Sequence, residues 1–147
     1  MKDLFSIKGK VALVTGGSRG IGEMIAAGFL ASGAKVYISS RKAEVCDATA
    51  DRLSSEYGGE CISLPSDLSH LEGIESLVTE LSNKESHLDI LINNAGAAWG
   101  APLDEYPEKG WDKVMDINVK GVFFLTQKLL PLLREGAKSN PSRVVNI

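Results

Sequence analysis

A glycine-rich segment that directly follows a short apolar run constrains this chain more than any other feature. Residues 11–14 read VALV and residues 15–22 read TGGSRGIG, which places glycines at positions 16, 20 and 22. The resulting Gly-x3-Gly-x-Gly spacing differs from the Gly-x-Gly-x2-Gly of the commonest dinucleotide fingerprint. Taken alone, such a loop is compatible both with a phosphate-binding turn and with an ordinary flexible turn, so its surroundings must decide.

The surroundings favour phosphate binding. Apolar residues at positions 21, 25 and 29 have helical spacing, a glycine at position 33 is typical of a helix end, and residues 35–40 form a second strand-like run. Together these segments predict a βαβ unit of about 30 residues. In such a unit Gly16 permits the tight turn, Gly20 lets the backbone approach a pyrophosphate, and Gly22 lets the helix pack closely. The helix would direct its free N–H groups toward the anion.

The same alternation of strands and helices continues to the end of the chain. We predict strands at residues 11–15, 35–40, 60–64, 88–93 and 143–147, and helices near 20–32, 42–57, 69–84 and 108–136. This pattern predicts an α/β fold with a Rossmann-like, doubly wound parallel sheet and helices on both faces. We assign the apolar stripes of the last two helices to the core, namely Leu71, Ile74, Val78 and Leu81 in one and Trp111, Val114 or Met115, Val122, Leu125 and Leu129 in the other.

Composition narrows the classes of function. The formal net charge is −3 and no block of lysine or arginine stands out, which disfavours a nucleic-acid partner. The two cysteines lack metal-binding or redox spacing, so we expect no metal site. The first ten residues lack the apolar core of a signal peptide, and no apolar run approaches about 18 residues, which predicts a cytoplasmic protein without a membrane span. A length of 147 residues favours a single domain.

Residues at the carboxyl ends of the strands are candidate ligand contacts, because open α/β sheets bind ligands there. After the second predicted strand come Ser40, Arg41 and Lys42, at a place where an acidic residue would bind a ribose hydroxyl and repel a 2′-phosphate. Arg19 in the glycine loop can face the same place, and guanidinium groups bind phosphate through two hydrogen bonds. We therefore predict a preference for NADP(H) over NAD(H). The alternative is that Arg41 and Lys42 belong to the solvated first turn of a helix.

The later strand ends carry further polar residues. Asp67 and Leu68 suit an adenine amino group and its ring edge, although Asp67 or Ser66 could equally cap a helix. Residues 93–96 read NNAG, which either closes the strand end against a cofactor or forms a plain turn. Asn118 lies inside a predicted helix, where asparagine is unfavourable by roughly half a kcal/mol, so we expect a buried hydrogen bond at that residue.

These motifs, in this order and at these intervals, closely resemble those of the short-chain dehydrogenase/reductase family from about residue 5 to residue 147. The resemblance implies a homo-oligomer that acts with NAD(P) on a small-molecule carbonyl substrate, and Ser40 and Arg41 match the NADP-preferring branch. It also implies a catalytic role for Asn118, which matches an asparagine that helps to hold a proton-relay water. The implied cofactor-binding residues are Gly16, Ser18, Arg19, Gly20, Ile21, Gly22, Ser40, Arg41, Asp67, Leu68, Asn94, Ala95 and Gly96.

The sequence departs from the family pattern in the main catalytic residues. Members of the family carry a serine and a Tyr-x3-Lys pair, whereas Tyr37, Tyr57 and Tyr106 all lack a lysine four positions later. We therefore expect residues 1–147 to form a dinucleotide-binding domain that stops before the catalytic segment, with a sheet incomplete on its C-terminal side. The leading hypothesis is part of an NADPH-dependent carbonyl reductase, and residues 95–111 show a weaker similarity to 3-oxoacyl-thioester reductases. The alternative is a short, non-catalytic NADP-binding protein or sensor.

Overall fold

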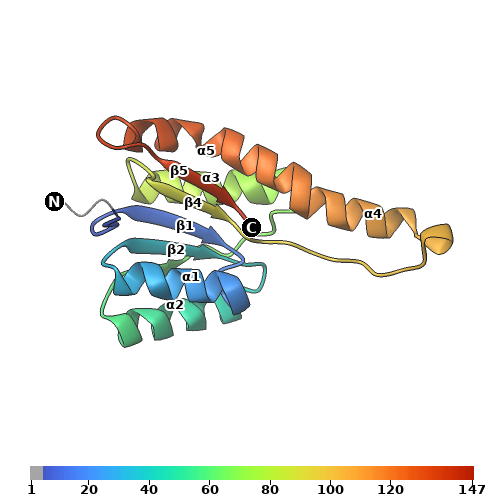
Figure 1. Cartoon of the computed structure of the whole chain (residues 1–147), viewed down its shortest axis with the longest axis horizontal. Helices are drawn as coiled ribbons and strands as arrows, with labels where there is room; N and C mark the ends of the chain where they lie inside the picture. The colour runs from blue at the N-terminus through green and yellow to red at the C-terminus, as the bar shows by residue number, and fades with distance from the viewer. Residues whose placement is uncertain (1–4) are drawn as a thin grey trace.

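The fold is built on a sheet of five parallel strands in the order β3-β2-β1-β4-β5. The computed structural model describes residues 5–147. The strands are β1 (Val11–Thr15), β2 (Lys35–Ser39), β3 (Cys61–Ser63), β4 (Ile90–Asn93) and β5 (Arg143–Asn146). The order reverses at β1, which has β2 on one side and β4 on the other (Figure 1). This order is that of a doubly wound Rossmann sheet, so the predicted fold class is confirmed.

Helices cover both faces of the sheet, as Figure 1 shows. The helix predicted near residues 108–136 is interrupted, because a π-helical segment, η2 (Asp116–Gly121), separates α4 from α5. A 3-10 turn, η1 (Leu103–Glu105), precedes α4. A π turn accommodates an extra residue in one turn of a helix, and the helical spacing of apolar residues in this region did not predict it. The α-helices are α1 (Gly20–Ala31), α2 (Ala43–Tyr57), α3 (Leu71–Lys84), α4 (Glu108–Met115) and α5 (Val122–Gly136).

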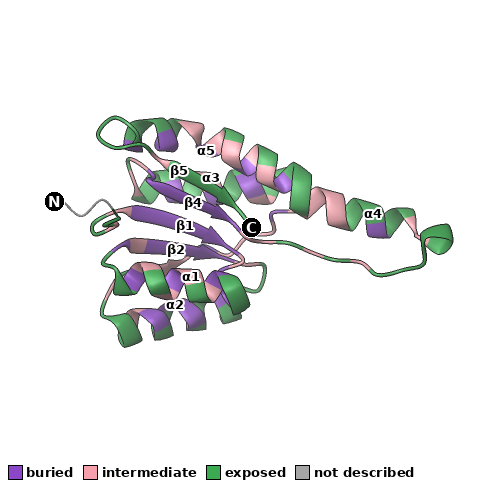
Figure 2. Ribbon diagram, viewed as in Figure 1, coloured by how far each residue is buried: buried purple, intermediate pink, exposed green. Residues whose placement is uncertain are grey.

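The alternation of side chains along the central strands divides the core into two layers. Leu13 of β1 packs with residues of α3 and α5, such as Leu77 and Leu129. Its neighbours Ala12 and Val14 pack with residues of α1 and α2. Successive strand residues are therefore buried on opposite faces, which explains why β1, β2 and β4 read as nearly continuous apolar runs (Figure 2).

Two parts of the chain are more exposed than the apolar patterns predict. The segment of residues 96–115, here called the arm, extends beyond the end of the sheet (Figure 1), so α4 has no sheet beneath it. As a result Trp111 is 59% exposed, and its predicted place in the core is wrong. Leu71 at the start of α3 is also 40% exposed, whereas Ile74 and Leu81 are buried as predicted.

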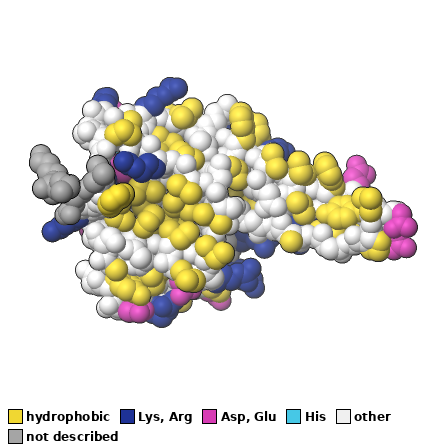
Figure 3. Space-filling view, in the orientation of Figure 1, with side chains coloured by type: hydrophobic (Ala, Val, Ile, Leu, Met, Phe, Trp, Pro, Cys, Tyr) yellow, Lys and Arg dark blue, Asp and Glu magenta, His cyan; other side chains and the backbone are white. Residues whose placement is uncertain are grey.

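The edge strand β5 is the second exposed part. All four of its residues are exposed (Figure 2), although the strand reads as an apolar run. Among residues 5–147 it pairs with β4 alone. Hydrophobic side chains gather over the middle of the sheet in the view of Figure 3. Among residues 5–147, no helix combines the length and apolar character needed to cross a membrane.

Candidate cofactor and substrate site

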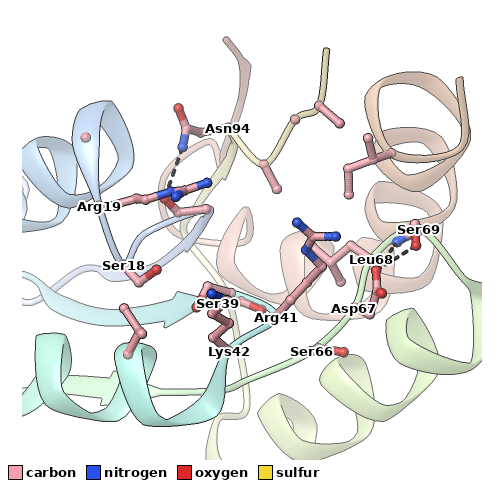
Figure 4. A pocket seen from close by; sticks show the side chains of 18 of the residues that line it. Ser18, Arg19, Ser39, Arg41, Lys42, Ser66, Asp67, Leu68, Ser69 and Asn94 are labelled. Atoms are coloured by element: carbon pink, nitrogen blue, oxygen red, sulfur yellow. Dashed lines mark hydrogen bonds between the residues drawn. The ribbon is translucent and has the colours of Figure 1, made fainter. Parts of the chain in front are cut away.

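A cleft of about 720 Å³ lies at the carboxyl ends of the strands, where the strand order reverses. Four consecutive segments contribute to its walls: the glycine loop after β1 and the segments that follow β2, β3 and β4. Figure 4 shows Arg19 reaching into this space from the glycine loop and Arg41 from the end of β2. The arm and η2 add Ala97, Lys113, Asp116 and Ile117. A cleft at this position is where sheets of this topology bind nucleotides.

The glycine loop is held in a conformation that leaves no room for side chains at Gly16, Gly17 and Gly22. Gly16 has φ +65°, and a Cβ at this position would lie 2.8 Å from Nδ2 of Asn94. A Cβ at Gly22 would lie 2.3 Å from the carbonyl oxygen of Gly16. Gly22 therefore packs α1 against the loop itself, and the helix N-terminus is brought close to the turn. Gly20 has open space around its α-carbon, which leaves the backbone accessible there.

Thr15 and Asn94 join the glycine loop to the end of β4. The hydroxyl of Thr15 donates to the carbonyl of Ile92 at 3.2 Å and accepts hydrogen bonds from the backbone N–H groups of Asn94 and Ala95, both at 3.0 Å. In return, Nδ2 of Asn94 donates to the carbonyl of Thr15 at 3.0 Å. These bonds use backbone groups that lie beyond the regular ladder, so the two strand ends form a rigid floor for the cleft.

Polar groups near the end of β2 and β3 lack internal partners. The hydroxyl oxygens of Ser39, Ser40 and Ser63 are buried without a hydrogen bond to any described residue. Within residues 5–147, no carboxylate lies within 4.0 Å of the charged groups of Arg19 or Arg41. Buried hydroxyls normally find partners, and unpaired guanidinium groups attract anions. The region is therefore suited to a phosphorylated, hydroxyl-rich ligand.

Asp67, after β3, makes a local turn and does not cap a helix. Its Oδ1 accepts hydrogen bonds from the backbone N–H and the hydroxyl of Ser69, at 3.0 Å and 2.6 Å. Burial by itself would raise the pKa of this carboxyl, but these bonds and the electrostatic effect of His70 and Arg41 lower it below its usual range. Asp67 is therefore ionised at neutral pH and lines the cleft as a hydrogen-bond acceptor.

Asn118 is exposed, so the prediction that its hydrogen bond is buried is wrong. The side chain nevertheless has two partners, because Oδ1 accepts from the N–H of Ala97 at 3.0 Å and Nδ2 donates to the carbonyl of Ala97 at 2.7 Å. Asn118 lies within η2, where the helix is widened. Its amide therefore pairs with the backbone of the arm just after β4, and asparagine disfavours regular helix at that point.

Most of the predicted cofactor residues line the cleft. Gly22 does not, because it is buried behind the glycine loop, and Asn118 lies outside the lining residues. The sequence did not single out Thr15, whose role depends on β4, or Lys113 and Asp116, which the arm and η2 bring to the site. Those that do line the cleft are Gly16, Ser18, Arg19, Gly20, Ile21, Ser40, Arg41, Asp67, Leu68, Asn94, Ala95 and Gly96.

Comparison with known proteins agrees with this geometry. The family model for short chain dehydrogenases matches residues 10–147. This chain belongs to that family. The resemblance expected from the glycine loop and the NNAG segment to short-chain dehydrogenases is thus confirmed, and it extends over nearly the whole chain.

Individual short-chain dehydrogenase relatives share both sequence and fold. A Pseudomonas aeruginosa protein named as a rhamnolipids biosynthesis 3-oxoacyl-[acyl-carrier-protein] reductase is 53% identical over 148 residues. The solved RhlG/NADP active-site complex from Pseudomonas aeruginosa is 53% identical with a TM-score of 0.92, and the match covers 99% of this chain and 57% of that one. L-sorbose reductase from Gluconobacter frateurii, solved with NADPH and L-sorbose, is 28% identical with a TM-score of 0.89, covering 96% and 52%.

Each match covers a larger share of this chain than of the relative. The first relative is matched over 100% of this chain but over 57% of its own length. This chain therefore spans about half the length of the relatives that it matches.

Proposed function

We propose that the protein is an NADP(H)-dependent oxidoreductase that reduces a carbonyl group, and that residues 1–147 act as its dinucleotide-binding domain. The observation that carries this proposal is the set of unpartnered groups in the cleft. Ser39 and Ser40 offer buried hydroxyls without internal partners, while Arg19 and Arg41 offer cations without a neighbouring carboxylate. This combination fits the 2′-phosphate and ribose of NADP(H). The relatives solved with NADP or NADPH support the same assignment.

When bound, NADPH supplies a hydride to the carbonyl carbon of a substrate. The residues of this chain bind and orient. Backbone groups of the glycine loop and the N-terminus of α1 face the pyrophosphate, and Arg19 with Arg41 binds the 2′-phosphate. Asp67 accepts a hydrogen bond from the adenine amino group, beside Leu68. Ala95 and Gly96 have small or no side chains, so the cofactor would lie against their backbone. Hydrogen bonds that join Thr15 to Asn94 and to Ala95 hold this segment in place.

Asn118 has a positioning role in this proposal. Its side-chain amide is occupied at both ends by Ala97, so it fixes the start of the arm against η2. A proton-relay water held by Asn118 would therefore be bound through its main chain. None of the tyrosines of this sequence belongs to a Tyr-x3-Lys pair, and we assign the proton donor to no residue of this chain.

We propose a 3-oxoacyl thioester as the substrate. The name of the 53% identical relative, a 3-oxoacyl-[acyl-carrier-protein] reductase, supports this choice. The alternative of a non-catalytic NADP sensor is less well supported, because the named relatives are reductases and dehydrogenases.

The test measures binding and turnover in the whole protein. Calorimetric titration is expected to show tighter binding of NADPH than of NADH, by about ten- to a hundredfold, because one charge-assisted contact contributes roughly 1.5–3 kcal/mol. NADPH oxidation should then follow the addition of a 3-oxoacyl thioester. NADPH binding without turnover of any carbonyl substrate would support the sensor, and equal affinity for both cofactors would contradict the NADP assignment.

We further propose that the protein is a homo-oligomer located in the cytoplasm. Trp111, Val119 and Phe123 are 59%, 53% and 60% exposed along α4, η2 and α5, and a second copy would cover them. Cys46 and Cys61 are both free thiols, which is common in a reducing compartment. Light scattering of the purified protein and fractionation of cells test these two proposals.

A further inference from the structure

Trp99, in the arm, packs against the backbone of α4. The contact is at Gly110, the buried residue of that helix. A Cβ at position 110 would lie 2.8 Å from both Cγ and Cδ1 of the Trp99 indole and 2.9 Å from its Nε1. Three ring atoms at nearly equal distance place the face of the indole against the helix, and any larger residue at position 110 would displace it. The ring therefore packs the first part of the arm against α4.

Two lysines lie over the same indole. Nζ of Lys109 is 5.6 Å from the ring centroid and Nζ of Lys113 is 5.4 Å from it. In the part of the chain that the structure describes, neither Nζ has a carboxylate within 4.0 Å. Like charges four residues apart on a helix repel each other, and the ring offsets this repulsion only partly. A bound anion would relieve it.

Lys113 lies at the edge of the cofactor cleft, and Lys109 lies one helical turn before it in α4. Lys113 lines the cleft together with Asp116 and Ile117, on the side formed by the arm. The carboxylate of Asp116 lies 3.6 Å from Nζ of Lys120, which reduces its competition for Lys113. The acidic residues Asp104 and Glu105 belong to η1, and Figure 3 shows acidic side chains at the far end of the arm, away from the sheet. The arm thus places one cation, Lys113, in the lining of the cleft, beside Asp116.

We propose that Trp99, Lys109 and Lys113 form an anion site that binds the phosphate of the carrier arm of an acyl thioester. This inference rests on the proposed function, since it concerns the substrate of the same cleft. An acyl group is delivered as a thioester of phosphopantetheine, whose phosphate lies at the end remote from the reacting carbonyl. The acyl end would enter the cleft while the phosphate stays at its rim. Lys109 and Lys113 bind the phosphate, and Trp99 holds both ammonium groups in place.

The first test is a binding experiment that does not depend on turnover. The whole protein, saturated with NADPH so that its own phosphate contacts are filled, is titrated with 4′-phosphopantetheine and with pantetheine. The wild-type protein is expected to bind the phosphorylated compound about tenfold more tightly, and the double variant Lys109→Gln/Lys113→Gln should lose this difference. The matched control is Lys8→Gln/Lys84→Gln, which removes two exposed lysines that are not part of the cleft. Equal binding of the two compounds by the wild type, or loss of the difference in the control, would overturn the proposal.

The second test separates this proposal from the proposed function. For a 3-oxoacyl coenzyme A thioester, KM should rise about tenfold in the lysine double variant with kcat unchanged, while the phosphate-free N-acetylcysteamine thioester should show no change. A protein that reduces neither thioester but still prefers 4′-phosphopantetheine would contradict the proposed substrate and keep the anion site. A weaker affinity for NADPH in the double variant would assign the lysines to the cofactor and overturn the anion site. A lower KM for the thioester on a carrier protein than on coenzyme A would identify the carrier as the source of the phosphate.

Discussion

The two ends of the sheet differ in how far their polar groups are paired. At the amino ends of the strands, Lys10 contacts Asp89 at 2.9 Å, and Glu85 accepts hydrogen bonds from Lys35 at 2.8 Å and from Tyr37 at 2.6 Å. At the carboxyl ends lie the buried oxygens without a partner among residues 5–147, which belong to Ser39, Ser40, Ser63 and Asn93.

This difference separates stability from binding within one sheet. Paired ions and hydrogen bonds at the amino ends stabilise the fold without any ligand. Unpaired buried polar groups at the carboxyl ends lower the stability of the free protein. A ligand that forms hydrogen bonds with these groups removes this destabilisation, and the free energy gained contributes to its affinity. Substitutions at the two ends should therefore affect different measurements.

The largest effect is expected at the carboxyl end, for Gly22→Val. The new Cβ would lie 2.3 Å from the Gly16 carbonyl, so α1 and the glycine loop cannot keep their contact. NADPH binding should weaken by more than about a hundredfold, and the free energy of unfolding should fall by roughly 1–3 kcal/mol. Calorimetry and urea unfolding measure the two effects.

Gly28→Ala is the control for this substitution. Gly28 lies in the same helix, and a Cβ there would meet no atom within 4 Å. NADPH affinity should be unchanged, and stability should rise by up to about 1 kcal/mol because alanine favours the helix. Unchanged NADPH binding by Gly22→Val would show that the loop is not a phosphate site.

Asp89→Asn tests the amino end. Asp89 is 4% exposed and accepts hydrogen bonds from the N–H of Val11 and from Lys10, both at 2.9 Å. The substitution should lower the free energy of unfolding by about 2–3 kcal/mol and leave the Kd for NADPH unchanged. A tenfold change in the Kd for NADPH would contradict the view that the amino ends of the strands contribute to stability and not to cofactor binding.

The pH dependence of Asp89→Asn sharpens the same test. Burial would raise the pKa of Asp89, but the bonds from Val11 and Lys10 outweigh it, so the pKa is lowered from 3.8. A lowered pKa in the folded state means that the stabilisation is present above pH 3.8 and is lost as the pH falls further. The difference between wild type and variant in urea unfolding should therefore be constant near pH 7 and shrink below about pH 4.

Arg41→Ala tests the preference for a 2′-phosphate. NADPH binding should weaken by about ten- to a hundredfold and NADH binding should stay the same, because only NADPH carries that phosphate. The free energy of unfolding should not change, since Arg41 is exposed and has no ion-pair partner among the described residues. Arg134→Ala, in the exposed last turn of α5, is the control. An equal loss for both cofactors would contradict the role of Arg41.

The smallest effect is expected for Tyr37→Phe at the amino end. It removes one hydrogen bond to Glu85 and should cost about 1 kcal/mol at pH 8 without changing cofactor binding. Burial and the bond to Glu85 raise the pKa of Tyr37 from 10.0 to about 12, so the stabilisation is lost as the pH rises through this range. The difference between wild type and variant should therefore disappear by about pH 12. If the difference in free energy of unfolding stayed constant from pH 8 to pH 12, the hydrogen bond that the Tyr37 hydroxyl donates to Glu85 would not be the source of the stabilisation.

Local sequence predicted the elements of the sheet because their signals lie within a few residues. The strand limits at β1 and β2 and the turn at Gly16 agree with the structure to within one residue, since a nearly continuous apolar run and a glycine at positive φ leave local signatures. The exposure of Trp111 and the π turn at Asn118 were not predicted. Both depend on the arm, which leaves the sheet and brings Ala97 back to η2.

The sequence by itself determined the order of strands and helices, the glycine turn and membership of a family of dinucleotide-binding sheets. Only the tertiary structure decided which polar groups are paired. Thr15 is hydrogen-bonded to Asn94, 79 residues away in the sequence, and Tyr37 to Glu85, 48 residues away. The hydroxyls of Ser39 and Ser63 have no hydrogen-bond partner among the described residues. Periodicity reports the face on which a side chain lies, but hydrogen bonds form between specific atoms about 3 Å apart. Packing of distant segments decides those distances, and with them where this protein is stable and where it can bind.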